Sequence, residues 1–147
     1  METMTNTQVQ PYLFFGGRCE EALAFYRKAL DAQIDMVSKY SDSPEPAPPG
    51  MLAPGYENKV MHCQFRVGGS TIMASDGCRE DDKTGAGFKL ALSVATEAEA
   101  DRAFAVLADG GNVTMPLSKT FWSQKFGMVT DRFGIEWMVN VAGEQSK

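Results

Sequence analysis

The sequence of 147 residues predicts an α+β protein of two tandem βαβββ modules, whose curved mixed sheet lines a cleft. The first observation is that a strand pattern, a helix pattern and three strand patterns follow one another twice along the chain. The second is that the halves align, with Gln10 over Lys89 at an offset of 79 (89 − 10) and Gly69 over Gly134 at an offset of 65 (134 − 69). A proline-rich insertion at residues 41–58 accounts for the smaller offset. The alternative is one irregular α+β domain whose halves resemble each other by chance.

The first module is expected over residues 9–78. VQPYLFFGG (9–17) is aromatic and β-branched, which is typical of a strand, and it ends in two glycines. CEEALAFYRKAL (19–30) has an apolar helical stripe, with acidic residues in its first turn and basic residues in its last, as the helix dipole favours. Residues 32–40 indicate a second strand, and residues 59–76 indicate a β-hairpin that turns at two glycines.

Residues 41–58 contain five of the seven prolines, so we expect a long loop rather than a regular element. Loops of this length are often lids or binding segments, and the alternative is a disordered connector. Residues 79–86 are expected to link the modules. Flexible tails are expected at residues 1–8 and 143–147.

The second module is expected over residues 87–142, within one domain overall. GFKLALSVA (87–95) indicates a strand, and Thr96 followed by Glu99 is a capping box that begins a helix. Two glycines at 110 and 111 end that helix. Three further strands are expected at residues 112–120, 123–131 and 135–141.

The composition is that of a soluble globular protein, with 44% hydrophobic and 22% charged residues. A net charge of −5 and the lack of a basic cluster argue against nucleic acid as a partner. No apolar run approaches the roughly 20 residues of a membrane span, and the first residues do not form a signal peptide pattern. The three cysteines have no metal-binding spacing, so we expect reduced thiols in the cytoplasm.

Strand alternation predicts which side chains face the cleft, because successive residues of a strand point to opposite faces. One face of each sheet is expected to cover a helix, and the other to line the cleft. On the cleft side we place Gln10, Tyr12, Phe14, His62, Met73, Lys89 and Met138. A slip of one residue would instead turn Ala74 or Val139 inward, and the sequence leaves this open.

Three stretches, PYLFFGGRCEEALAFYRKAL, MHCQFRVGGSTIMASD and PLSKTFWSQKFGMVTDRFGIEW, resemble the PhnB-like group of the vicinal oxygen chelate superfamily. That superfamily includes glyoxalase I, bleomycin-resistance proteins and ring-cleaving dioxygenases. The resemblance covers residues 9–141 and implies the fold above, a small-molecule ligand and a homodimer. Some relatives are labelled demethylubiquinone methyltransferases, but this sequence predicts neither the parallel βαβ sheet nor the glycine-rich turn of a nucleotide-type cofactor domain.

In metal-using members of the superfamily, residues of the first and last strands of each module hold a divalent metal. The resemblance places those positions at Gln10, Met73, Lys89 and Met138. A thioether is a soft ligand, and an ammonium group has no lone pair, so these side chains are poor ligands for Zn, Ni, Mn or Fe(II). We therefore expect no metal and no cofactor.

His62 and Lys89 are weak candidates for catalysis. His62 is a possible general base, and a desolvated Lys89 is a possible base or a partner for an anionic ligand. The ordinary alternatives are a strand histidine that makes a hydrogen bond and a solvated lysine. An unusual metal site built from His62, Asp76 and Glu136, with Cys63 nearby, also stays open.

The sequence therefore predicts that a small organic ligand binds in the cleft without the usual divalent metal. The expected ligand-binding residues are Gln10, Tyr12, Phe14, His62, Met73, Lys89, Trp122 and Met138. Trp122 has the alternative of a buried core aromatic. One alternative function is a metal-dependent lyase, isomerase or dioxygenase of the glyoxalase type. The other is a non-catalytic dimeric module with a filled cleft, and the loop at 41–58 is a candidate contributor to a partner subunit's cleft.

Overall fold

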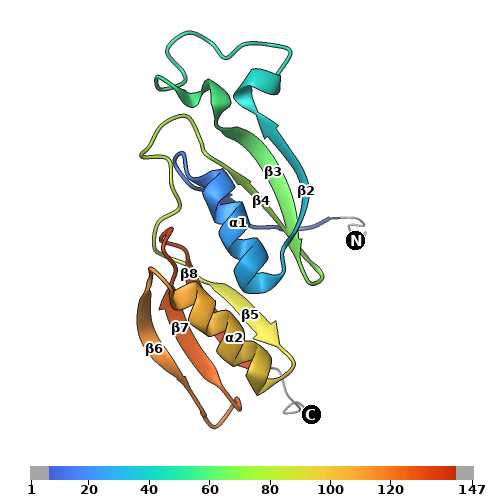
Figure 1. The fold of residues 1–147 in the computed structure, drawn as a ribbon, viewed down its shortest axis with the longest axis vertical. Coiled ribbons are helices and arrows are strands. Elements are labelled where there is room, and N and C mark those ends of the chain that lie inside the picture. Colours follow the sequence, from blue (N-terminus) through green and yellow to red (C-terminus); the bar gives the residue numbers. More distant parts are fainter. Residues whose placement is uncertain (1–6, 142–147) are drawn as a thin grey trace, which may run out of the picture. The chain divides into compact units, whose positions relative to one another are not determined.

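A computed structural model describes residues 7–141, and the chain divides into two compact units. Unit 1 comprises Met1–Leu23 and Ala32–Lys83, and unit 2 comprises Ala24–Asp31 and Thr84–Lys147. Each unit contains one four-stranded mixed sheet, which confirms the predicted α+β class and the two tandem modules (Figure 1). The tail predicted at 143–147 lies outside the described residues, as do the first six residues of the other tail.

The sheet of unit 1 has the strand order β1-β4-β3-β2. The first strand runs parallel to β4, and the other neighbours are antiparallel. The elements of the first module are β1 (Tyr12–Phe14), α1 (Cys19–Leu30), β2 (Gln33–Lys39), β3 (Val60–Val67) and β4 (Ser70–Ser75). The helix and the hairpin therefore form where the sequence predicts them.

The first strand is shorter than its sequence predicts, because it begins at Tyr12 rather than at Val9. Val9 is 98% exposed and pairs with no strand. Pro11 has no N–H to donate to a ladder, although its carbonyl accepts a hydrogen bond from the Met73 N–H at 3.0 Å. Gln10 accordingly lies before the strand and not within it.

Helix α1 contributes residues to both units. Its first turn belongs to unit 1, whereas Ala24–Asp31 belongs to unit 2. In unit 2 the ring of Tyr26 is fully buried and packs edge-on against Trp137, with ring centroids 5.7 Å apart. Phe25 packs against Phe133 in the same way at 5.5 Å. Aromatic pairs of this geometry stabilise a core beyond the area that they bury.

The proline-rich loop contains short helical turns and is hydrogen-bonded to the rest of unit 1 near both ends. It contains two short 3₁₀ helices, at Tyr40–Asp42 and Tyr56–Asn58. The hydroxyl of Tyr56 donates to the Gly16 carbonyl at 2.8 Å, and the hydroxyl of Tyr40 donates to the Gly77 carbonyl at 2.7 Å. Both ends of the loop are thus hydrogen-bonded to other segments of unit 1.

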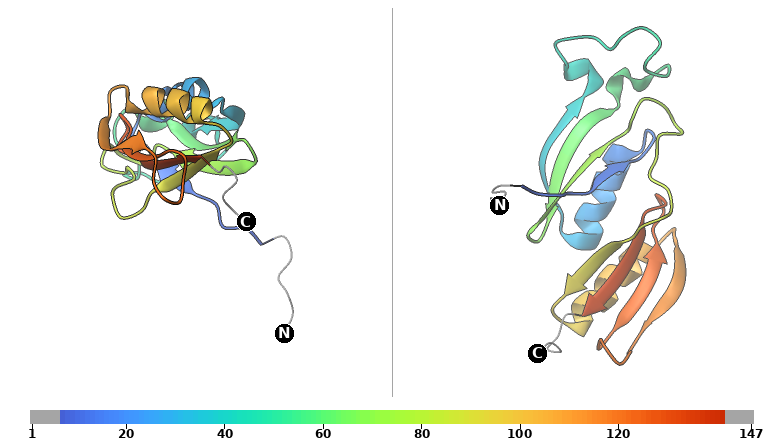
Figure 2. Two further views of the ribbon diagram at one scale, coloured as in Figure 1. Left: turned by 90° about the horizontal axis from the view of Figure 1, so that it is seen from below. Right: turned by 180° about the vertical axis from the view of Figure 1, so that it is seen from behind.

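The sheet of unit 2 has the equivalent order β5-β8-β7-β6, again with its first and last strands parallel. Helix α2 begins with the predicted capping box, since Glu99 N–H donates to Thr96 Oγ1 at 3.1 Å. The helix lies across one face of the sheet and leaves the other face open (Figure 2). Neither helix of the described chain is long and apolar enough to cross a membrane. The elements of the second module are β5 (Leu90–Val94), α2 (Glu97–Ala108), β6 (Asn112–Ser118), β7 (Phe126–Thr130) and β8 (Glu136–Val141).

Candidate functional site

The register of unit 1 defines a row of side chains on the open face of its sheet. Tyr12 lies opposite Met73, Met73 opposite Gln64, and Gln64 opposite Met36. Directly opposed residues in neighbouring strands share a face, and Tyr12 is 40% exposed, so this row lies on the open side. The adjacent Ala74 is fully buried on the other side. Met73, and not Ala74, therefore belongs to the open face.

Aromatic side chains cluster at one edge of this face. The ring of Tyr12 lies 5.2 Å from that of Phe14 and 5.6 Å from that of His62. The hydroxyl of Tyr12 and His62 Nδ1 are 2.9 Å apart. Burial raises the pKa of Tyr12, so its hydroxyl keeps its proton over a wider pH range and can donate to the imidazole. His62 is thus hydrogen-bonded within its sheet, with the aromatic rings beside it.

Unit 2 carries a matching row made almost entirely of methionines. Met115 lies opposite Met128, Met128 opposite Met138, and Met138 opposite Ala91. All three thioethers are half-buried, and Val139 is fully buried on the helix side. The strand order equates this row with Met36, Gln64, Met73 and Tyr12 of unit 1. The repeat could have predicted Met36 and Met115, because they are related by the same offset of 79 (115 − 36).

The four positions that hold metal in metal-using relatives do not fit a hard divalent cation here. Lys89 Nζ lies 2.7 Å from the Glu136 carboxylate, and the Gln10 amide donates to Gln8 Oε1 at 2.7 Å. Met73 and Met138 supply soft thioethers, which are poor partners for such ions. Within residues 7–141, no group of three or more His, Cys, Asp or Glu side chains is placed to hold a metal ion.

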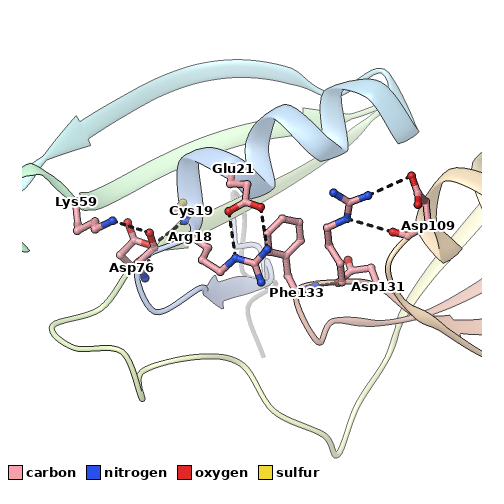
Figure 3. Close-up of polar contacts among 10 residues, drawn as sticks. Arg18, Cys19, Glu21, Lys59, Asp76, Asp109, Asp131 and Phe133 are labelled. Carbon is pink, nitrogen blue, oxygen red and sulfur yellow. Dashed lines mark hydrogen bonds and ion pairs between the residues drawn. The ribbon is translucent and has the colours of Figure 1, made fainter.

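Asp76, a member of the unusual metal site considered above, is instead committed to the backbone. It is 1% exposed and accepts hydrogen bonds from the N–H groups of Gly17, Cys19 and Val60 at 2.7–2.9 Å. Figure 3 shows its carboxylate at the start of α1, beside Cys19. A helix N-terminus is a natural anion site, and this chain fills it with its own carboxylate. Sequence reasoning considered Asp76 as a possible metal ligand and missed this role.

The turn that precedes β8 has the same kind of buried carboxylate. Asp131 is 3% exposed and accepts from the Tyr26 hydroxyl at 2.5 Å and from Trp137 Nε1 at 2.9 Å. It also accepts from the N–H groups of Phe133 and Ile135. Figure 3 shows Asp131 close to Phe133. Its hydrogen-bonding capacity is used within the core of unit 2, so it takes no part in a ligand site.

The three cysteines are free thiols, as the sequence predicts. The sulfur atoms of Cys19 and Cys63 lie 3.6 Å apart, and both residues are fully buried. The hydrogen bond to Cys63, together with burial, raises the pKa of the Cys19 thiol. Cys78 is partly exposed.

The loop between β6 and β7 presents two exposed aromatic side chains at the end of unit 2's open face. Phe121 is 97% exposed and Trp122 is 46% exposed, so Trp122 is not a buried core residue. The ring of Trp122 lies 5.5 Å from that of Phe126. Phe126 is directly opposite Asn140, whose Oδ1 atom is buried and has no hydrogen-bond partner among the described residues. Phe126 and Asn140 were absent from the predicted ligand-binding set.

The sequence matches the model of the 3-demethylubiquinone-9 3-methyltransferase family over residues 7–140. The chain belongs to this family. Among curated relatives, Protein YjdN of Escherichia coli (strain K12) is 37% identical over 144 residues, which cover 93% of this chain and 97% of YjdN. Among solved structures, PA1353 of Pseudomonas aeruginosa is 42% identical with a TM-score of 0.80, covering 92% of this chain and 98% of that chain.

A second solved structure carries the name of the same family. It is described as "Putative 3-demethylubiquinone-9 3-methyltransferase, PhnB protein" from Bacillus cereus, with 30% identity and a TM-score of 0.76 over 92% of this chain and 100% of that chain. Fosfomycin resistance protein FosX of Mesorhizobium loti, at 13% identity and a TM-score of 0.61 over 93% of this chain and 92% of FosX, shares the fold alone. The predicted membership of the PhnB-like group is confirmed. The fold shared with FosX agrees with the predicted vicinal oxygen chelate fold.

Proposed function

We propose that this protein binds a small organic ligand on the open faces of its sheets, without the divalent metal of metal-using relatives. The observation that carries this proposal is the pair of matched rows, which places thioethers at equivalent positions of both modules and an aromatic ring at the end of the row in unit 1. Met73 and Met138 are half-buried rather than enclosed, so both remain accessible to a ligand.

Apolar side chains of this kind suit an organic ligand of modest size. Thioethers are flexible and polarisable, and they adapt to irregular apolar shapes. Tyr12, Phe14 and Trp122 are between 38% and 46% exposed, although aromatic side chains of this size are usually covered in a folded domain. Ligand sites are mostly apolar surfaces with a few polar groups that fix orientation. His62 and Lys89 are the candidates for those polar contacts, with Gln10 at the margin of unit 1's face.

The location and the assembly are part of the same proposal. Three free thiols support a reducing compartment, and we place the protein in the cytoplasm. The resemblance to the superfamily supports a homodimer, which light scattering on the purified chain would detect as twice the mass of one subunit.

Two measurements on the full chain, purified without chelator, test the proposal. Elemental analysis after dialysis is expected to find metal at background, also after incubation with Zn, Ni, Mn and Fe(II). A thermal-shift screen of small aromatic, aliphatic and antibiotic compounds is expected to raise the melting temperature with selected ligands, because a ligand that binds only the folded state stabilises it. Chelator should leave those shifts unchanged.

Matched variants connect the ligand to the open faces. Met73→Ala is expected to weaken about tenfold a screen hit that binds on the open face of unit 1, and Met138→Ala one that binds on the open face of unit 2. Each variant removes a thioether that contacts the ligand. Val113→Ala is the control and should bind as the wild type does, because Val113 is exposed and lies opposite Val129, on the helix side of unit 2's sheet. Stoichiometric metal that survives dialysis, or a screen without any hit, would overturn the proposal.

A further inference from the structure

We propose that the open face of unit 2 selects an uncharged aromatic ligand that carries an N–H or O–H donor, and that Asn140 accepts this hydrogen bond. This inference rests on the proposed function, because it names the ligand class of one of the two faces. Three features of that face support it. The side-chain oxygen of Asn140 has no hydrogen-bond donor among residues 7–141, the ring of Trp122 is exposed nearby, and the one charged residue of the strands, Glu136, is paired with Lys89.

The acceptor is the side-chain oxygen of Asn140. Its Oδ1 atom is buried and receives no hydrogen bond from the described residues, although Asn140 as a whole is only half-buried. Buried polar atoms in folded proteins are almost always paired, so an unpaired amide oxygen on a ligand-facing strand calls for an explanation. The χ2 torsion of asparagine is broad, so the proposal requires only a rotation about χ2 to turn Oδ1 toward a ligand. A donor on a ligand would then satisfy it.

The neighbouring surface is suited to a planar ring. Trp122 is 46% exposed and contacts Phe126, which is the residue directly opposite Asn140. The loop that holds Trp122 is shaped by Thr120 Oγ1, which accepts hydrogen bonds from the N–H groups of Trp122 and Ser123 at 3.3 and 3.0 Å. These hydrogen bonds fix the turn that carries the indole ring of Trp122. Its exposed surface offers a stacking partner for a second aromatic ring.

Thioethers extend this surface away from the indole. Met138 precedes Asn140 by two residues in β8, so both side chains lie on the same face. Met128 lies directly opposite Met138. Sulfur atoms make favourable contacts with aromatic rings, often at the ring edge, which favours an aromatic ligand over an aliphatic one of equal size.

The strands of this face disfavour ionic ligands, because they carry almost no charge. Glu136 is the only charged residue in the four strands of unit 2. Its carboxylate is already paired with Lys89 Nζ at 2.7 Å. A carboxylate or phosphonate bound on these strands would lose hydration and would find no cationic side chain within them. The ligand class is therefore uncharged.

The test compares four probes by titration calorimetry on the full chain. Indole and 3-methylindole carry the N–H donor, 1-methylindole lacks it at the same size as 3-methylindole, and indole-3-carboxylate adds a negative charge. We expect indole and 3-methylindole to bind at least tenfold more tightly than 1-methylindole and than indole-3-carboxylate. Equal affinity for 3-methylindole and 1-methylindole would overturn the role of the donor, and equal affinity for the carboxylate would overturn the charge argument.

Variants assign the selectivity to the residues named. Asn140→Leu, which is similar in size and lacks an acceptor, is expected to reduce the ratio between 3-methylindole and 1-methylindole to below twofold. Asn140→Ser is a second variant in case the first does not fold. It should also reduce the ratio to below twofold, because the shorter serine side chain does not reach the N–H group of the ligand. Trp122→Leu should weaken 3-methylindole and 1-methylindole by a similar factor and keep their ratio. A tenfold ratio that persists in both Asn140 variants would contradict the assignment.

The indole titrations and the thermal-shift screen together distinguish a failure of this inference from a failure of the proposed function. If none of the indoles binds while the thermal-shift screen yields a hit that Met73→Ala weakens, the inference fails and the proposed function stands. If the screen yields no hit either, both fail.

Discussion

Asp131 serves two parts of unit 2 with one carboxylate. It accepts two backbone N–H groups within its own turn, and it accepts side-chain donors from Tyr26 and Trp137. The same carboxylate therefore stabilises both the turn and the packing of Tyr26 and Trp137 in the core. Figure 3 shows Asp131 beside Phe133, whose ring packs against that of Phe25 in α1.

Asp131→Ala is expected to lower the free energy of unfolding by about 3 kcal/mol, because it leaves several buried donors without an acceptor. Urea denaturation followed by far-UV circular dichroism measures the change. Tyr26→Phe is the matched control, since it removes a single donor and is expected to cost about 1 kcal/mol. Equal losses in the two variants would mean that the carboxylate contributes little beyond its bond to Tyr26.

The cysteines should differ in reactivity because they differ in burial. We expect one thiol, Cys78, to react with a disulfide reagent such as dithionitrobenzoate in the native protein, and all three to react in urea. Cys19 and Cys63 are fully buried, and the raised pKa of Cys19 further lowers its thiolate fraction. Cys78→Ser should abolish the native reaction. Two or more fast thiols in the wild type would contradict the burial.

Tyr40 should make the protein less stable in alkali. Burial, with the contact to Cys78, raises its pKa to about 12, whereas an unfolded tyrosine titrates near pH 10. The folded state thus holds the phenol proton more tightly, so this contribution is fully present below about pH 10 and is lost as the pH rises toward 12. Stability measured across this range should fall less steeply in Tyr40→Phe. An unchanged slope would exclude Tyr40 as a cause.

At the scale of the elements, local signals predict most of the structure. The bounds of α1 coincide with the predicted helix, and the Thr96–Glu99 capping box forms as expected. The error at β1 also has a local cause, since Pro11 cannot extend the ladder. The hydrogen bonds near the two ends of the proline-rich loop connect Tyr40 to Gly77 and Tyr56 to Gly16, and contacts this distant in sequence leave no local pattern.

Close approach between strands makes Gly127 of β7 sensitive to substitution. A Cβ atom there would lie 2.9 Å from the Met115 carbonyl oxygen and 3.0 Å from the Phe104 ring. Gly127→Ala is therefore expected to lower the free energy of unfolding by about 2 kcal/mol through overpacking. Gly69→Ala is the matched control, because no atom lies within 4 Å of its Cβ position, and it should change stability by less than about 0.5 kcal/mol. Thermal and urea unfolding compare the two.

At the scale of the whole molecule, one continuous helix contributes to both compact units. We therefore expect the units to unfold together. Both tryptophans lie in unit 2 and all three cysteines lie in unit 1, so tryptophan emission and cysteine alkylation report on different units. The two probes should give the same urea midpoint. Separate midpoints would show that α1 does not couple the units.

The candidate site was predictable only in part. Strand alternation and the repeat place Met73 and Met138 correctly on the open faces. The ion pair of Lys89 with Glu136 and the unpaired oxygen of Asn140 depend on side-chain positions across strands. Composition and periodicity do not encode such positions.

The methionine rows also give the protein a built-in set of spectroscopic labels. Met36 and Met73 lie on the open face of unit 1, and Met115, Met128 and Met138 lie on that of unit 2. Carbon-13 in the methionine methyl groups alone would therefore place a reporter on each face without altering the sequence. A single two-dimensional spectrum, recorded as a compound is added, would tell which module it touches.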